Sequence, residues 1–132
     1  MDDPLCAGRF RRVELDNLDS WDRSRRLITR ADNRAFAKIL TRRGHAAGLA
    51  VAQKNWAELA TVGPELGFDF VVAEECGRYR ECGAYAAAYG DRVLVAEYRR
   101  KDFRRACTRW GDRLSIVLRD RAVSVDGVNR RC

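Results

Sequence analysis

The stretch FDFVVAEECGRYREC at residues 68–82 decides how the rest of the sequence is interpreted. Its first part (68–75) is aromatic and β-branched and then doubly acidic, which is typical of a short buried strand that ends at solvent. Cys76 and Cys82 follow, and their spacing would allow a disulfide to close a short loop after the strand. The alanine-rich segment 81–90 then ends at a glycine, which favours a helix.

Strand and helix patterns alternate on both sides of this stretch. Further strands are predicted at 10–16, 49–55, 92–98 and 114–120, with a long polar loop at 17–32. Further helices are predicted at 33–44 and 101–111, and the segment 56–67 is helical at first and is broken at Gly63-Pro64. Such alternation argues for a parallel sheet with right-handed crossovers. The even spacing of the later strands favours a barrel, and a doubly wound sheet is the alternative. The predicted fold class is therefore α/β.

Length and composition indicate a single domain. The 132 residues are 46% hydrophobic and 34% charged, so residues 1–132 are expected to form one globular domain. A complete (β/α)₈ barrel needs at least about 200 residues, so the chain is too short for one. No apolar run approaches the roughly 18 residues that span a membrane, and the N-terminus lacks the apolar stretch of a signal peptide. We therefore expect no membrane partner and no export signal within the chain.

The charge and the metal-ligating residues restrict the kinds of ligand that the protein is expected to bind. The formal net charge is +7, so a basic nucleic-acid-binding α/β protein is one alternative. The arginines are nevertheless spread among acidic residues without an aromatic-and-basic cassette, so we do not expect a nucleic-acid partner. The single histidine, His45, and cysteines without a CxxC pair do not form a zinc set, and no nucleotide-binding glycine motif occurs. No metal and no cofactor are predicted.

Ionisable residues follow the end of every predicted strand. They are Asp16 with Asp19, Lys54, Glu74 with Glu75, Glu97, and Arg119 with Asp120. The carboxyl ends of parallel strands form the rim where α/β proteins bind ligands. Asp16 and Glu74 are expected two strands apart on the inner face, so their carboxyls could flank one glycosidic bond, whose cleavage needs a proton donor and an ionised partner. Backbone spacing does not separate a retaining from an inverting pair.

Five segments occur in an order that resembles a known family of enzymes. They are VELDNLD (13–19), AQKN (52–55), the stretch 68–82, VLVAEY (93–98) and VLRDR (117–121). The chain resembles the endo-α-1,4-polygalactosaminidase family, glycoside hydrolase family 114, from about residue 8 to the last cysteine. The resemblance implies a TIM barrel, and hydrolysis of a galactosamine-containing polysaccharide by enzymes that are usually extracellular.

The resemblance also implies roles for individual residues. The catalytic pair would be Asp16 and Glu74, and the substrate-binding residues would be Asn17, Asp19, Lys54, Asn55, Glu97, Tyr98 and Asp120. Secretion would explain a Cys76–Cys82 disulfide and a possible Cys107–Cys132 disulfide. Cys6 would then be the one cysteine outside these two bridges.

The resemblance further implies that the five predicted strands are the last five of eight. The domain would then be an open partial barrel without its N-terminal strands, with two free sheet edges that invite association. The missing N-terminal half of the barrel would be its partner, and the chain alone would show little or no activity. An inactive carbohydrate-binding fragment is the second alternative.

Overall fold

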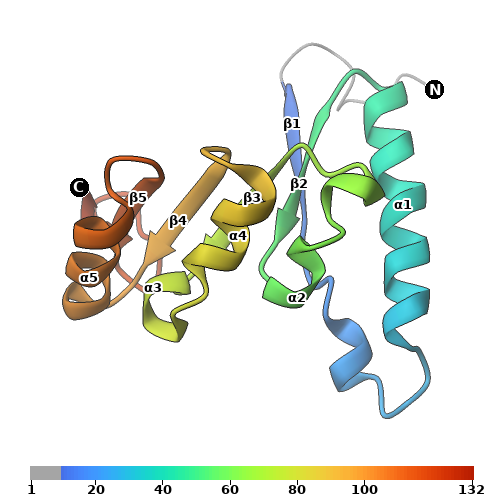
Figure 1. Ribbon diagram of the computed structural model, residues 1–132, viewed down its shortest axis with the longest axis horizontal. Helices are drawn as coiled ribbons and strands as arrows, with labels where there is room; N and C mark the ends of the chain where they lie inside the picture. Colours follow the sequence, from blue (N-terminus) through green and yellow to red (C-terminus); the bar gives the residue numbers. More distant parts are fainter. Residues whose placement is uncertain (1–9) are drawn as a thin grey trace.

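A computed structural model describes residues 10–132 as one sheet with helices packed against it (Figure 1). The strands are β1 (Arg12–Leu15), β2 (Ala50–Lys54), β3 (Phe70–Glu74), β4 (Val93–Glu97), β5 (Ser115–Arg119) and β6 (Asn129–Arg131). They lie side by side in the order of the sequence, and the first five are parallel. Sequential order is that of a barrel wall, whereas the order reverses in a doubly wound sheet. The five predicted parallel strands are confirmed.

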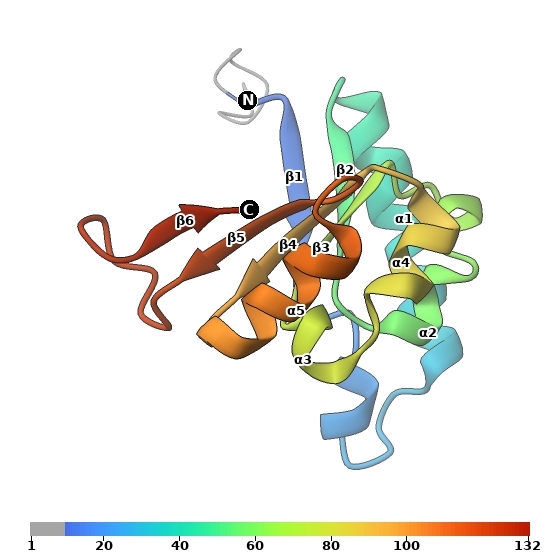
Figure 2. The same ribbon diagram turned by 60° about the vertical axis from the view of Figure 1, so that its left-hand side comes forward.

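Helices cover one face of this sheet (Figure 2). They are the short 3₁₀ helix η1 (Ser20–Arg23), α1 (Arg30–Ala46), α2 (Ala57–Ala60), the 3₁₀ helix η2 (Pro64–Leu66), α3 (Cys76–Tyr79), α4 (Cys82–Tyr89) and α5 (Arg100–Trp110). The segment 56–67 is divided into α2 and η2, as the predicted break at Gly63-Pro64 requires, because Pro64 lacks the amide hydrogen that a continuous helix would need. The single turn α3 was not predicted. No helix within residues 10–132 has the length and the apolar character needed to cross a membrane.

Helix α1 is longer at both ends than its sequence pattern predicts. It begins after Thr29, whose hydroxyl accepts a hydrogen bond from the Asp32 amide while the Asp32 carboxylate accepts one from the Thr29 amide. This capping box satisfies two amide groups at the start of the helix, inside the predicted loop. The helix continues through Gly44, where a Cβ atom would come within 2.5 Å of Val51. Gly44 therefore permits close packing on β2 and does not end the helix.

The two faces of the sheet differ in how well they are covered. Alternate strand residues, such as Val51, Val71 and Val95, are buried against the helices and form the core with aromatic residues of α4 and α5. The opposite face, which would line the inside of a barrel, carries no helix from residues 10–132. Leu94 lies on it and is 44% exposed, beside a hollow of about 280 Å³ that Val72 and Val117 also line. The sheet is therefore open on its inner side.

The last strand was not predicted, because its sequence is polar and all three of its residues are exposed. It pairs antiparallel with β5, and Leu118 lies opposite Arg130 in the register. A disulfide between Cys107 of α5 and Cys132 follows β6 directly. The edge of β5 is therefore covered within the chain.

Candidate active site

Lys54, the last residue of β2, lies at the centre of a cluster of carboxylates. Its ammonium nitrogen is 2.9 Å from Glu14, 3.7 Å from Asp16 and 3.6 Å from Glu74. The Lys54 side chain is only 13% exposed. Burial alone would lower the pKa of Lys54, but the hydrogen bond to Glu14 and the three negative charges outweigh burial and raise it. Lys54 therefore stays protonated and holds the carboxylates together.

This arrangement brings the two predicted catalytic carboxyls close to each other. The nearest oxygens of Asp16 and Glu74 lie 3.7 and 3.6 Å from one nitrogen atom, so they cannot be further apart than the sum of these distances, about 7.3 Å. Carboxyl pairs in retaining glycosidases are about 5–5.5 Å apart, and in inverting ones about 6.5–9.5 Å. Asp16 is 63% exposed and Glu74 36%, so both remain accessible to a ligand.

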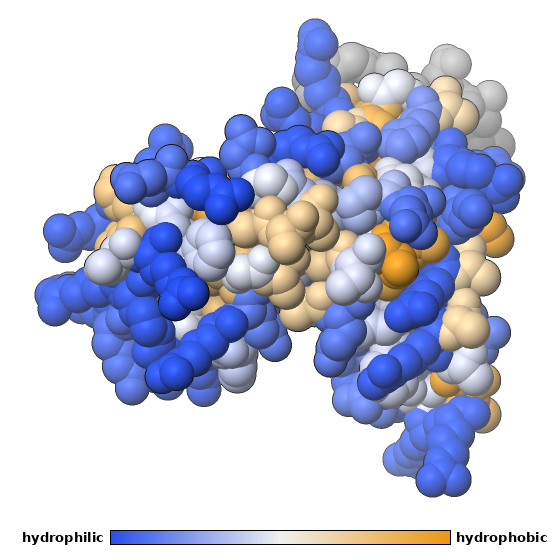
Figure 3. Space-filling model, in the orientation of Figure 1, coloured by the Kyte–Doolittle hydropathy of each residue, from blue (hydrophilic) through white to orange (hydrophobic). Residues whose placement is uncertain are grey.

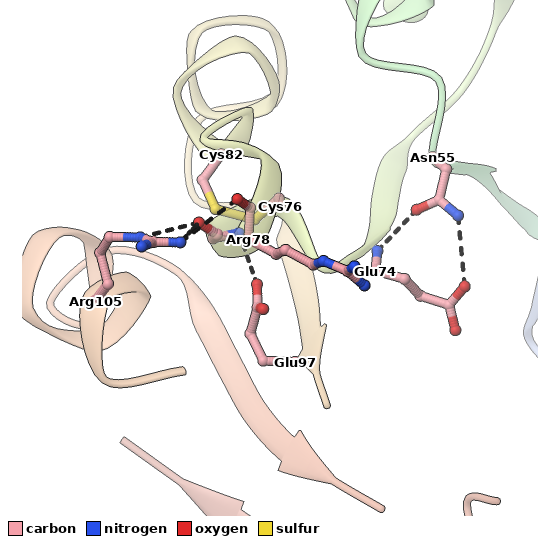
Figure 4. Close-up of a disulfide and its surroundings, with 8 residues drawn as sticks. Asn55, Glu74, Cys76, Arg78, Cys82, Glu97 and Arg105 are labelled. Atoms are coloured by element: carbon pink, nitrogen blue, oxygen red, sulfur yellow. Dashed lines mark hydrogen bonds between the residues drawn. A yellow bond between two sulfur atoms is a disulfide. The ribbon is translucent and has the colours of Figure 1, made fainter. Parts of the chain in front are cut away.

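Asn55 and Tyr98 fix the position of Glu74. The Asn55 side chain accepts a hydrogen bond from the Glu74 amide at 2.7 Å and donates one to the Glu74 carboxylate at 3.4 Å (Figure 4). The Tyr98 hydroxyl donates to the other carboxylate oxygen. Burial, followed by the hydrogen bond to Glu74, raises the pKa of Tyr98, so the hydroxyl remains a donor. Residues that follow the two neighbouring strands, β2 and β4, thus converge on the carboxylate at the end of β3.

A buried amide positions Asn55 in turn. Gln53 faces the helices, and its amide nitrogen donates to the carbonyl oxygens of Asn55 at 2.7 Å and Trp56 at 3.0 Å. Both of these residues have positive φ, a strained conformation that the two bonds help to hold. The Gln53 oxygen accepts a hydrogen bond from the Tyr89 hydroxyl at 2.7 Å. Sequence reasoning missed Gln53, because nothing in the pattern AVAQK distinguishes it from an exposed residue.

Glu75 was noticed in the sequence but not included among the predicted site residues. Its carboxylate is 12% exposed and is bound by Arg78 at 2.9 Å and Arg121 at 3.3 Å. The Arg121 guanidinium also lies over the Tyr98 ring, 5.5 Å from its centre. Glu75 therefore links the chain that follows β5 to the site. The two adjacent glutamates at the end of β3 were the sequence feature from which Glu75 could have been predicted as a site residue.

A hollow of about 460 Å³ extends from Glu74 across the ends of β1, β2 and β3. Its charged lining is acidic apart from one arginine, and consists of Asp19, Asp22, Glu58, Glu74, Glu75, Glu81 and Arg30. Its aromatic lining is Trp21, Trp56, Tyr79 and Tyr85. The Trp21 and Trp56 rings are 6.0 Å apart, and the Arg30 guanidinium lies 4.2 Å from the centre of Trp21. An acidic and aromatic hollow suits a ligand with positive charge and apolar ring faces.

Three predicted substrate-binding residues are occupied within the protein. Asn17 and Asp19 both accept hydrogen bonds from Arg23, at 3.0 and 3.2 Å, although Asp19 also lines the hollow. The Asp120 carboxylate accepts bonds from the amide and hydroxyl of Ser124, at 3.0 and 2.9 Å. Asp120 thus stabilises the turn before β6.

Glu97 needs a correction. We expected it to contact substrate beside Tyr98, but the structure buries it completely on the face of the sheet that the helices cover. Its carboxylate accepts a hydrogen bond from the Gly77 amide at 2.6 Å (Figure 4). In β4, residues alternate between the two faces, and Glu97 shares its face with Val93 and Val95. We therefore remove Glu97 from the candidate site.

Two disulfides form among residues 10–132. Cys76 and Cys82 are bonded with Cα atoms 4.9 Å apart, and Cys107 and Cys132 with Cα atoms 5.5 Å apart. The first closes the segment between β3 and α4 and so holds α3 beside Glu75. Cys6 lies outside the described residues.

Comparison with known proteins shows the family and the fold of the chain. Residues 3–132 match the glycoside-hydrolase family GH114. The chain belongs to glycoside hydrolase family 114. Among solved structures, this family 114 chain is similar to Ega3 of Aspergillus fumigatus, which was crystallised in complex with galactosamine. The TM-score is 0.76 at 23% identity, and the match covers 92% of this chain and 54% of Ega3. No curated protein matches the chain.

The family 114 chain therefore spans about half the length of the Ega3 chain. Its fold is that of part of a TIM barrel, in which β1–β5 form consecutive strands of the wall. The pair Asp16 and Glu74, with Lys54 between them, lies at the carboxyl-terminal ends of these strands, where TIM-barrel enzymes place their active sites.

Proposed function

We propose that this chain supplies the catalytic carboxylates of an extracellular glycoside hydrolase that cleaves galactosamine-containing polysaccharide. The observation that carries the proposal is the Asp16–Lys54–Glu74 cluster, which holds two accessible carboxyls within about 7.3 Å at the ends of parallel strands. One carboxyl would give a proton to the leaving oxygen, while the other would act as nucleophile or base at the sugar carbon. The two disulfides support an oxidising compartment.

The hollow beside Glu74 supports an amino sugar as the substrate. A galactosamine unit has a free ammonium group, which the six carboxylates of the hollow would attract. The apolar face of the sugar would pack on an aromatic ring, as other ring-shaped ligands do. A nucleic acid would meet negative charge here, so the acidic lining speaks against the nucleic-acid alternative.

The open inner face supports a catalytic role only together with a further half of a barrel. Without that half, one wall of the substrate cleft is absent and the sugar is not held in a fixed pose. We therefore propose that the N-terminal half of a family 114 barrel is needed for turnover. The alternative is a carbohydrate-binding protein without activity. It predicts that sugar binds in the hollow and is not cleaved, either by the chain alone or by the chain joined to an N-terminal half.

The test measures reducing ends released from a galactosamine polymer by the chain joined to the N-terminal half of a family 114 barrel. Asp16→Asn and Glu74→Gln keep the side-chain shape and should each reduce the rate by about 10²–10⁴-fold. Glu14→Gln is the matched control, since Glu14 also binds Lys54 but is not one of the two catalytic carboxyls. Full activity of the Glu74→Gln protein would refute the assignment, and binding without cleavage by the unmodified protein would favour the alternative.

A further inference from the structure

A second hollow, of about 420 Å³, lies among the helices α3, α4 and α5. The charged side chains that line it within residues 10–132 are all arginines, namely Arg80, Arg105 and Arg109. Its apolar lining includes the Cys76–Cys82 disulfide, Ala106 and Trp110. We call it the basic hollow, because its charge is opposite to that of the acidic hollow beside Glu74.

Arg105 is held rigidly at the wall of the basic hollow. Its guanidinium donates to the Gly77 carbonyl from Nε at 3.1 Å and from Nη2 at 2.6 Å, and Nη2 also binds the buried Asp102 at 2.7 Å. Figure 4 shows this guanidinium directed at the α3 turn beside the disulfide. None of these hydrogen bonds uses Nη1, so Arg105 keeps one fixed nitrogen that can donate to a ligand.

The other two arginines of the basic hollow lack a counter-charge. Among residues 10–132, neither Arg80 nor Arg109 forms an ion pair, and the nearby carboxylates of Glu75 and Asp102 bind other arginines. Arg105 and Arg109 are one turn apart on α5, where like charges repel each other. A hollow lined by one sign of charge attracts ions of the opposite sign, so a bound anion would relieve this repulsion.

The local structure keeps these two side chains at the hollow despite their repulsion. Arg80 has a φ of 61° and lies in the short segment that the Cys76–Cys82 disulfide closes. The Arg109 guanidinium lies 5.7 Å from the centre of the Trp110 ring, whose face attracts a cation. The three positive charges are therefore positioned from α5 on one side and from the disulfide-closed segment on the other.

We propose that the basic hollow binds a sugar unit that carries an oxyanion, either the carboxylate of a hexuronate or a sulfate ester. Guanidinium groups offer paired N–H donors that match the oxygens of such anions. The disulfide, Ala106 and Trp110 offer apolar surface to the body of the ring. A hollow of about 420 Å³ has the size that holds a small organic ligand.

A sugar is the expected carrier of the anion, because the chain belongs to a glycoside hydrolase family. A nucleic acid fits less well, since it carries a phosphate at every nucleotide and needs a continuous basic track. Glu81 follows Arg80 directly and lines the acidic hollow, so the basic surface is interrupted there. Binding in the basic hollow uses none of the residues of the proposed hydrolysis, so either proposal can fail without the other.

The first experiment uses the three tryptophans to distinguish the two hollows. Trp110 lines the basic hollow, whereas Trp21 and Trp56 line the acidic one. The full chain is titrated with galacturonate, galactose 6-sulfate, neutral galactose or inorganic sulfate, and NMR follows the indole N–H signals. We expect at least one acidic sugar to shift the Trp110 signal alone, and galactose to leave it unchanged.

The acidic sugar that binds at the lower concentration identifies the oxyanion. The absence of a Trp110 shift with both acidic sugars would overturn the proposal. Affinity for inorganic sulfate equal to that for the acidic sugars would also overturn it, because the hollow would then recognise charge without a sugar. A single-stranded oligonucleotide that displaces the sugar at a lower concentration than the sugar itself requires would assign the hollow to nucleic acid instead.

The second experiment assigns the binding residues by measuring the dissociation constant of the tighter acidic sugar. Arg80→Gln and Arg109→Gln should each raise it by about tenfold, since each removes a charge-assisted contact. Arg104→Gln is the matched control, because it removes the same charge from α5 at a residue that does not line the hollow. Circular dichroism checks folding, and if one variant does not fold the other decides. An equal loss in Arg104→Gln would show that net charge alone binds the sugar and would refute the site.

Discussion

Asp69 shows how a single carboxylate fastens two elements of the fold together. It accepts hydrogen bonds from the Val51 amide of β2 at 2.7 Å and from His45 near the end of α1 at 2.8 Å. Burial raises the pKa of Asp69, but the bonds to Val51 and His45 outweigh burial, so the pKa is lower than usual. The residue preceding β3 thereby ties α1 to the sheet, and His45 has a structural role.

We expect Asp69→Asn to destabilise the protein at neutral pH and much less in acid. Because the pKa of Asp69 is lower in the folded state, its stabilisation is present above the unfolded pKa of about 3.9 and is lost as the pH falls through the folded value. The side chain is partly exposed, so the loss at pH 7 should be about 1 kcal/mol. Urea unfolding at pH 7 and pH 3 measures it, and an equal loss at both pH values would contradict this explanation.

Glu74 and Glu97 show where sequence reasoning at single positions succeeds and where it ends. Both end a strand, and the sequence correctly placed both at the same edge of the sheet. Which face each side chain takes depends on which alternate set of residues packs on the helices. In β4 both sets are apolar apart from Glu97, so hydrophobicity did not show which set faces the helices, and the expected contact between Glu97 and substrate was wrong.

At the scale of elements, the turn between β2 and α2 depends on a helix that is distant in sequence. Tyr89 of α4 donates to Gln53, which binds the two strained residues of the turn. Gly63 leaves room for this pair, since a Cβ atom there would come within 2.5 Å of the Gln53 oxygen. The position of Asn55, and through it that of Glu74, therefore rests on packing between elements.

We expect Tyr89→Phe to lower the free energy of unfolding by about 1–3 kcal/mol, because it leaves the buried oxygen of Gln53 without a donor. Tyr85→Phe in the same helix is the control, since Tyr85 is equally buried but is not part of this network. Urea unfolding compares the two variants, and the NMR signal of the Asn55 side-chain amide reports the turn. Similar losses in both variants would show that the hydrogen bond contributes little.

Hydrophobic periodicity does not record the interactions that define the elements missed in the sequence. Thr29 and Asp32 form their capping box through side-chain geometry that hydrophobic periodicity does not record. The strand β6 is polar and exposed, and its pairing with β5 together with the bond from Cys107 to Cys132 defines it. A long-range partner thus fixes β6, whereas a local capping motif fixes the start of α1.

At the scale of the whole molecule, the helices shield one face of the sheet and leave the other open. On the side seen in Figure 3, pale orange surface gathers over α4 and blue hydrophilic surface surrounds it. This apolar strip comes from a helix rich in exposed alanine, whereas the open inner face of the sheet carries larger side chains such as Leu94. Exposed apolar side chains on the open face of the sheet favour association with another surface.

We expect the chain to self-associate as its concentration rises, because association would bury the open face of the sheet. Leu94→Lys should shift the equilibrium towards the monomer, since it places a charge in the middle of this face. Leu27→Lys is the control, because Leu27 is exposed in the loop before α1 and lies outside the sheet. Sedimentation velocity over a range of concentrations measures the effect, and a monomer at all concentrations would show that the face does not drive association.

The sparing use of lysine makes the candidate site visible to a chemical label. The sequence contains Lys38, Lys54 and Lys101 among its 26 basic residues, so tryptic cleavage at the arginines places each lysine on its own peptide. Amine acylation needs an accessible, unprotonated nitrogen. We therefore expect Lys38 and Lys101 to be acetylated quickly by an anhydride and Lys54 to be spared, because its ammonium group is enclosed by three carboxylates.

Mass spectrometry of the acetylated protein would then report the integrity of the carboxylate cluster without any substrate. The Glu14→Gln variant should acquire label at Lys54 faster than the parent protein, since Glu14 makes the shortest of the three contacts. Equal labelling of all three lysines in the parent protein would show that the cluster is not closed in solution. The rate at which an anhydride acetylates Lys54 could thus report, in any form of the chain, whether the carboxylate cluster has formed.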